Sequence, residues 1–188
     1  TGTYTNISGT ATSPNISNTA SAYYKASVRS GVCLTRETTP LLISVSPTSN
    51  TGSILPVTNT ICQNSTPTAI TLTGYTGTIQ WQSTNIPGGT YSDMVGQTGA
   101  TLPSSAIDNT ATGYYKAVVT SGVCPSITSE VASVQVDPAT VAGSIASSSN
   151  LICNGVTPPT ITLTGNTGST IQWRTRRASA VYVKPIPS

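Results

Sequence analysis

Histidine is absent from this sequence of 188 residues, and charged residues make up only 7% of it. The absence of histidine excludes Ser-His-Asp and Cys-His catalysis and most metal centres. The five carboxylates form neither an Asp-rich calcium loop nor an evident acid–base pair. We therefore expect a protein that is not an enzyme and that uses no cofactor or metal ion.

Long apolar runs and helix-forming residues are also scarce. No apolar run reaches the roughly eighteen residues of a membrane-spanning helix, so we expect no membrane span. Thr, Ser, Gly, Asn and Pro dominate, whereas Glu, Lys, Arg and Leu are few, which argues against helices. Because 36% of the residues are hydrophobic, the chain can still fold, and its composition predicts an all-β protein.

The net charge of +3 is small and unevenly placed, because several basic residues gather in a tail that begins at about residue 174. The rest of the chain is nearly neutral and offers no electrostatic footprint for DNA, RNA or anionic lipid. We therefore expect no nucleic-acid partner. The basic tail fits either a truncated or frame-shifted end, which we favour, or a site for an acidic partner. Its basic residues are Arg174, Arg176, Arg177 and Lys184.

The sequence does contain an internal repeat. The strings Tyr-Tyr-Lys-Ala at 23–26 and Ser-Gly-Val-Cys at 30–33 return at 114–117 and 121–124, which is 91 positions later. Thr-Leu-Thr-Gly at 71–74 and Ile-Cys at 61–62 return at the same spacing, at 162–165 and 152–153. One period shared by unrelated strings predicts modules of about ninety residues in tandem.

This period divides the chain into three segments. Residues 1–46 are the C-terminal part of one repeat, and residues 47–137 are a complete repeat. Residues 138–188 are the N-terminal part of a third repeat, followed by the divergent tail. Pro47 and Pro138 open the second and third segments, where proline ends strand pairing. We expect the chain to belong to a longer protein in which neighbouring repeats contact one another.

The middle segment has the pattern of short antiparallel strands. Residues 70–73 and 78–82 alternate apolar and polar side chains with a period of two, as half-buried strands do. Further strands are predicted at 114–120 and 130–136, with turn residues between them. About seven short strands in a unit of this length are the number expected of a β-sandwich.

Two strings resemble the immunoglobulin fold. Ile79-Gln80-Trp81 resembles its third strand, whose tryptophan is buried, and Gly113-Tyr114-Tyr115 resembles its sixth strand. The resemblance implies immunoglobulin-like antiparallel β-sandwich repeats in tandem, with a tyrosine corner at Tyr115. Ala117 takes the place of the usual cysteine, so the usual inter-sheet disulfide is absent. The implied core residues are Trp81, Tyr115 and Leu72, with Tyr24 and Trp173 at the repeated positions.

The repeated strings are also similar to the tandem repeats of large Bacteroidetes surface proteins, which include gliding-motility adhesins of the SprB type. The similarity covers nearly all of residues 1–173 and rests mainly on the strings at 60–62, 71–82 and 114–124. It implies export by the type IX secretion system and an extracellular location at the bacterial outer surface.

Each repeat contributes one early and one late cysteine, and four cysteines allow three connectivities. We expect a structural disulfide between Cys62 and Cys124, the pair that lies within the complete repeat. In the chain-entropy model such a loop stabilises the fold by on the order of 4 kcal/mol. The alternative joins Cys33 to Cys62 and Cys124 to Cys153, and so links successive repeats. Zinc is disfavoured because the chain has no histidine and no Cys-x-x-Cys spacing.

These features favour a non-catalytic stalk of an extracellular bacterial adhesin or gliding-motility surface protein. One alternative is a self-assembling filament subunit, in which a neighbouring chain completes the partial repeats. Another is a carbohydrate-binding or spacer module of a secreted enzyme, with Tyr75, Tyr91 and Tyr114 as candidates for stacking on sugars. The expected contacts are neighbouring repeats, surface polysaccharide and other cells.

Overall fold

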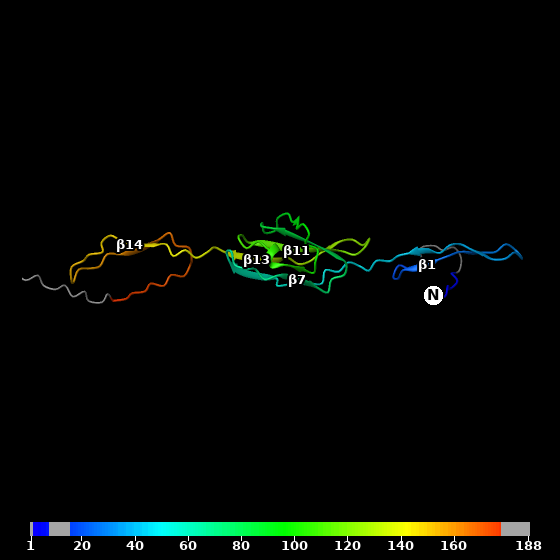
Figure 1. Ribbon diagram of the computed structural model, residues 1–188, viewed down its shortest axis with the longest axis horizontal. Helices are drawn as coiled ribbons and strands as arrows, with labels where there is room; N and C mark the ends of the chain where they lie inside the picture. Colours follow the sequence, from blue (N-terminus) through cyan, green and yellow to red (C-terminus); the bar gives the residue numbers. More distant parts are fainter. Residues whose placement is uncertain (1, 8–15, 178–188) are drawn as a thin grey trace, which may run out of the picture. The chain divides into compact units, whose positions relative to one another are not determined.

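The computed structural model describes residues 2–7 and 16–177, and within them the chain consists of β-strands, turns and loops (Figure 1). These residues contain no α-helix, and their single short 3-10 turn spans Ser104–Ala106. The prediction of an all-β protein is confirmed. The chain forms two compact units, Thr1–Val136 and Asp137–Ser188. The predicted joint at Pro138 lies at their boundary, whereas the predicted joint at Pro47 falls inside the first unit.

The first segment consists of two small antiparallel pairs of strands. β1 (Ala22–Tyr24) pairs with β4 (Leu41–Ile43), and β2 (Ser27–Val28) pairs with β3 (Arg36–Glu37). No side chain of these four strands is fully buried, because each pair packs little apolar surface on either face.

The middle segment contains two sheets. The smaller sheet has the order β10-β7-β5, with β7 (Ile70–Thr73) between β10 (Thr101–Leu102) and β5 (Ser53–Leu55). The larger sheet has the order β6-β13-β11-β8-β9, and β12 pairs with β11 beside this path. Its strands are β6 (Thr58–Cys62), β8 (Thr78–Thr84), β9 (Ser92–Asp93), β11 (Gly113–Thr120), β12 (Ile127–Thr128) and β13 (Ala132–Asp137).

Strand β11 shows why these residues form a sheet with one buried face. Its side chains alternate strictly between buried and half-buried, so that Tyr115, Ala117 and Val119 face inward. Every residue of β8 pairs with a residue of β11, and Trp81 lies opposite Ala117. The small alanine leaves room for the neighbouring indole, since cross-strand neighbours lie only about 5 Å apart.

One hydrophobic core draws on both sheets of the middle segment. β5, β7 and β10 contribute from the smaller sheet, and β8, β11 and β13 contribute from the larger one. Trp81 is 0% exposed, and Leu72 and Tyr115 are also buried, as the sequence predicts. The core residues are Ile54, Ile70, Leu72, Ile79, Trp81, Leu102, Ile107, Tyr115, Ala117, Val119, Ala132 and Val134.

The third segment forms one hairpin-like pair, in which β14 (Ser144–Ser147) lies antiparallel to β15 (Ile161–Thr164). The prediction that Trp173 lies in a core is wrong, because its side chain is 51% exposed. Among the described residues of this segment no strand takes the place that β11 has in the middle segment. The prediction for Tyr24 in the first segment holds only in part, because Tyr24 is half-buried.

Several hydrogen bonds of the first segment return in the middle segment 91 residues later. Other features return in the third segment, where the bridge between Val141 and Thr167 repeats the one between Asn50 and Thr76. Equivalent stretches therefore adopt the same local structure. The repeated bonds run from Val45 to Ser21 and from Val136 to Thr112, from Ala26 to Thr38 and from Ala117 to Ser129, and from Cys33 to Ser30 and from Cys124 to Ser121.

No helix within residues 2–7 and 16–177 has the length and apolar character needed to cross a bilayer.

Candidate functional site

The two aromatic residues predicted to organise the core are each fixed by a polar atom. The Trp81 indole Nε1–H donates to the carbonyl oxygen of Gly99 at 2.8 Å. The Tyr115 hydroxyl accepts a hydrogen bond from the Asp108 backbone N–H at 3.0 Å. Burial raises the pKa of Tyr115, and the bond from Asp108 opposes that rise. Both rings are therefore buried without leaving an unpaired polar atom, as the cost of burying such groups requires.

The contact made by Tyr115 also occurs in the first segment. The Tyr24 hydroxyl accepts from the Ser17 N–H at 2.8 Å, across the same separation of seven residues. Beside Tyr115 in the middle segment, Asp108 Oδ1 accepts from the Thr110 N–H at 2.8 Å and from the Thr110 hydroxyl at 2.7 Å. These bonds lower the pKa of Asp108, with the Thr110 hydroxyl as the largest cause.

Cys124 lies at the end of the middle segment where the chain enters it. The cysteine follows the C-terminal end of β11, and its Sγ is 3.6 Å from the Ser46 carbonyl oxygen and 3.3 Å from the Pro47 carbonyl oxygen. Gly122 has a φ of +52°, and a Cβ atom at this position would overlap the Ser46 side chain, so only glycine fits here without strain.

A buried hydrogen bond holds the same end together. The Ser121 N–H donates to Ser49 Oγ at 3.0 Å, and both serines are buried. Neither serine was singled out by the sequence. The signal for Ser121 was its place in the repeated Ser-Gly-Val-Cys string.

Cys62 lies at the opposite end of the middle segment, where the chain leaves it. It is the last residue of β6, and the following Asn64 N–H donates to the Asn109 carbonyl oxygen at 2.8 Å. At the same end the Val136 N–H donates to Thr112 Oγ1 at 3.0 Å. Asn109 and Thr112 both precede β11, whereas Cys124 follows it.

The predicted disulfide between Cys62 and Cys124 is therefore wrong. All four cysteines are free thiols, and the eight residues of β11 separate the two ends by about 26 Å at the usual rise per residue. A disulfide requires Cα atoms within about 7 Å of each other. The alternative pairs are absent as well, because Cys33 and Cys153 are also free and exposed.

Two lysines at the repeated position each lie over a tyrosine ring. Lys25 Nζ is 4.2 Å from the ring centre of Tyr4, and Lys116 Nζ is 4.1 Å from that of Tyr91. Burial, with a smaller contribution from Tyr114, raises the pKa of Tyr91. One face of the Tyr91 ring is thus occupied by a lysine.

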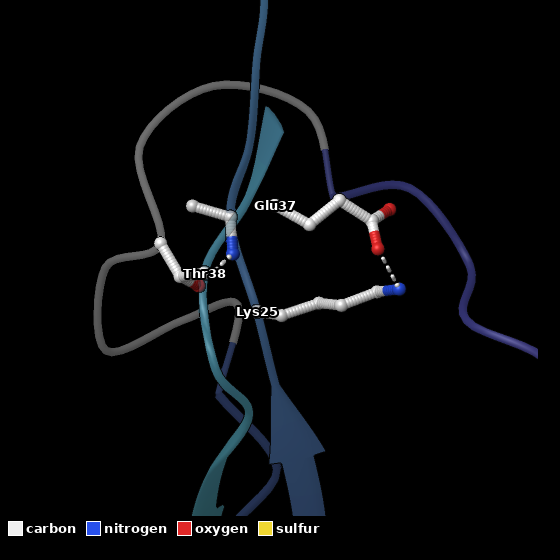
Figure 2. Close-up of polar contacts among 4 residues, drawn as sticks. Lys25, Glu37 and Thr38 are labelled. Carbon is white, nitrogen blue, oxygen red and sulfur yellow. Dashed lines mark hydrogen bonds and ion pairs between the residues drawn. The ribbon is translucent and has the colours of Figure 1, made fainter. Parts of the chain in front are cut away.

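The first segment adds an ion pair at this position. Lys25 Nζ lies 2.7 Å from Glu37 Oε2, and nearby the Ala26 N–H donates to Thr38 Oγ1 at 3.0 Å (Figure 2). Thr128 takes the place of Glu37 in the middle segment, so Lys116 has no equivalent acidic neighbour. Because the pair is partly exposed, it contributes at most about 1 kcal/mol.

A shallow depression of about 600 Å³ lies beside strands β8 and β11. Its aromatic residue is Tyr75, and its polar groups are hydroxyls and one amide, so it holds no acid–base pair for catalysis. Within residues 2–7 and 16–177 no three metal-ligating side chains come together. The lining residues are Tyr75, Gly77, Thr78, Ile79, Gln80, Thr98, Val118 and Thr120.

Comparison with known proteins gives the limits of one domain and identifies no activity. Residues 50–138 match a protein family described as "Domain of unknown function (DUF8696)". No curated protein and no solved structure matches the chain. The matched range covers nearly the whole middle segment, 47–137, which the repeat period defines independently. The middle segment of this chain is thus similar to the domain of unknown function DUF8696.

Proposed function

We propose that the chain is part of a non-catalytic extracellular stalk, built from immunoglobulin-like β-sandwiches in tandem. The stalk belongs to a bacterial adhesin or a gliding-motility surface protein, exported by a type IX system and displayed outside the cell. Its role is mechanical, because it holds a binding end away from the cell surface.

The positions of the two ends of the middle segment carry this proposal. The chain enters beside Cys124, after the C-terminal end of β11, and it leaves beside Thr112, before the N-terminal end of that strand. Because these ends lie on opposite sides of the core, each added copy extends the protein by at least the length of β11, or about 26 Å.

The chemistry of the middle segment also supports a mechanical role. Its core is closed by side chains from two sheets, and its most buried aromatic residue is hydrogen-bonded. The depression beside β8 contains only one aromatic residue and no acid–base pair. A stalk needs a durable core, and the closed, hydrogen-bonded core of the middle segment supports this role.

Solution scattering on proteins with one, two, three and four copies of residues 47–137 tests the stalk. We expect the maximum dimension to grow by a constant increment of at least about 26 Å per copy. A maximum dimension that rises far more slowly would show that the copies cluster, and would contradict the proposal. Labelling of intact producing cells with an antibody to residues 47–137 tests the location, and staining only after permeabilisation would contradict it.

The partial segments favour self-assembly as a second function. Ile161 is 56% exposed, whereas Ile70 at the equivalent position of the middle segment is 1% exposed. Val28 and Leu41 of the first segment are exposed too, although Val119 and Ala132 at their equivalent positions are buried. The third segment of one chain could cover the first segment of another as β7 and β8 cover β11.

Sedimentation of the whole chain over a range of concentrations tests this second function. Residues 47–137 alone are the matched control, because they have no partial segment. Association of the whole chain with a monomeric control supports assembly through the partial segments. A monomeric whole chain, or equal association of the control, excludes it.

A further inference from the structure

The two cysteines of the middle segment lie near different joints. Cys124 lies near the joint where the segment begins, and Cys62 lies near the end where the chain continues into the next repeat. Cys124 Sγ is 3.3 Å from the carbonyl oxygen of Pro47, the proline that opens the middle segment. Pro138 stands at the position that corresponds to Pro47, because it opens the next repeat 91 residues later. In a complete following copy, the late cysteine would therefore lie against Pro138.

Cys62 lies near the joint at Pro138 as well, but it belongs to the repeat that precedes this joint. β6 lies next to β13, and the Ser133 N–H donates to the Val57 carbonyl oxygen at 2.8 Å. Both strands run from this bond toward the end of the core that holds Asn109 and Thr112. Five residues beyond Val57 is Cys62, and five residues beyond Ser133 is Pro138. Since neighbouring strands lie about 5 Å apart, this pairing brings the end of β6, with Cys62, near the end of β13, after which Pro138 follows.

We propose that Cys62 of one complete repeat forms a disulfide with the late cysteine of the repeat that follows it, at the position of Cys124. Both cysteines would then lie beside the same joint, so the bond links one repeat to the next. This arrangement explains why the two cysteines stand at opposite ends of one repeat and are both free within it. It leaves each complete repeat with one bond to the copy before it and one bond to the copy after it.

The reaction is the oxidation of two thiols. The S–H bonds of both cysteines break, one S–S bond forms, and two protons and two electrons leave. A small-molecule disulfide such as oxidised glutathione accepts the electrons and is reduced to two thiols. Cys62 is exposed and Cys124 is half-buried, so the oxidant can reach the pair.

The inference requires only that two complete repeats follow one another, so it stands independently of the stalk function. A bond across the joint would limit bending between repeats and would resist their separation under load. It closes a loop of more than one repeat, for which the chain-entropy model gives a large stabilisation.

The test uses two copies of residues 47–137 joined directly, which keeps the Asp-Pro junction found at 137–138. All the buried core residues fall between Ile54 and Val134, so each copy carries a core of its own. In one variant, Cys124→Ser in the first copy and Cys62→Ser in the second leave only the proposed pair. In the matched control, Cys62→Ser in the first copy and Cys124→Ser in the second leave the two outer cysteines.

Both variants are treated with oxidised glutathione at high dilution. Alkylation and mass spectrometry of the monomer then count free thiols, mixed disulfides with glutathione and disulfides within the protein. We expect the proposed pair to close a disulfide within the protein, with both glutathiones released. The control should keep its cysteines as free thiols or as mixed disulfides with glutathione, which the protein's mass distinguishes from a closed pair. The unsubstituted two-copy protein should form one disulfide within the protein, and peptide mapping should place it between the copies. Retention of both thiols in the first variant, equal closure in the control, or a bond within one copy would overturn the proposal.

Discussion

The middle and third segments contain the same strings and bury them very differently. Trp81 is 0% exposed, whereas Trp173, the corresponding tryptophan, is 51% exposed. The hairpin-like pairing nevertheless survives, since Ser144 faces Thr164 just as Ser53 faces Thr73. The pairing of these two strands is thus set by local sequence. Burial of their side chains depends on β11 and β13, which come from far along the chain.

The largest expected difference between the two segments concerns their tryptophans. In the whole chain, Trp81→Ala should lower the free energy of unfolding by about 3–5 kcal/mol, because it leaves a large cavity and an unpaired Gly99 carbonyl. Trp173→Ala should change it by less than about 0.5 kcal/mol, as exposed positions usually do. Urea unfolding followed by circular dichroism measures both, and equal losses would contradict the comparison.

A smaller difference is expected at the repeated tyrosine contact. Tyr115→Phe removes the acceptor for the Asp108 N–H in a buried setting and should cost about 1–3 kcal/mol. Tyr24→Phe should cost less, because Tyr24 is only half-buried and water can reach the Ser17 N–H. Thermal unfolding of the two variants beside the parent chain tests this order. A larger loss for Tyr24→Phe would reverse it.

The smallest effect concerns pH. The pKa of Asp108 is lowered in the folded chain, whereas an unfolded aspartate has a pKa of about 3.9. The ionised carboxylate therefore stabilises the fold above about pH 4, and this contribution is lost as the pH falls toward the lowered pKa.

Asp108→Asn should accordingly flatten part of the decline in stability below about pH 4 and change little near neutral pH. Ser17 occupies the equivalent position in the first segment and has no carboxylate, so Ser17→Ala is the matched control. The midpoint of urea unfolding, measured at several pH values, decides the point. An unchanged acid decline in Asp108→Asn would remove this role from Asp108.

The sequence predicts most of the long strands of the middle segment. The alternating stretch at 70–73 coincides with β7, and the stretches at 78–82, 114–120 and 130–136 overlap β8, β11 and β13. The shortest strands, such as β9 and β10, were not predicted, because two residues cannot show a period.

The cysteines could not be placed from the sequence, for a physical reason. Their pairing depends on which strands lie side by side, and β6 joins the sheet next to β13, which carries it toward the end opposite Cys124. Spacing along the chain contains no such information. The exposure of Trp173 was missed for a related reason, because a repeated string does not reveal whether its covering strands are present.

Hydrogen exchange at the two indole nitrogens of the whole chain tests the central claim most directly. That claim is that the middle segment closes a core by itself and that the equivalent stretch of the third segment does not. The Trp81 indole N–H, bonded to the Gly99 carbonyl, should exchange only through global unfolding, whereas the Trp173 indole N–H should exchange near the rate of a free indole. Comparable protection of the two groups, or fast exchange at Trp81, would contradict the account.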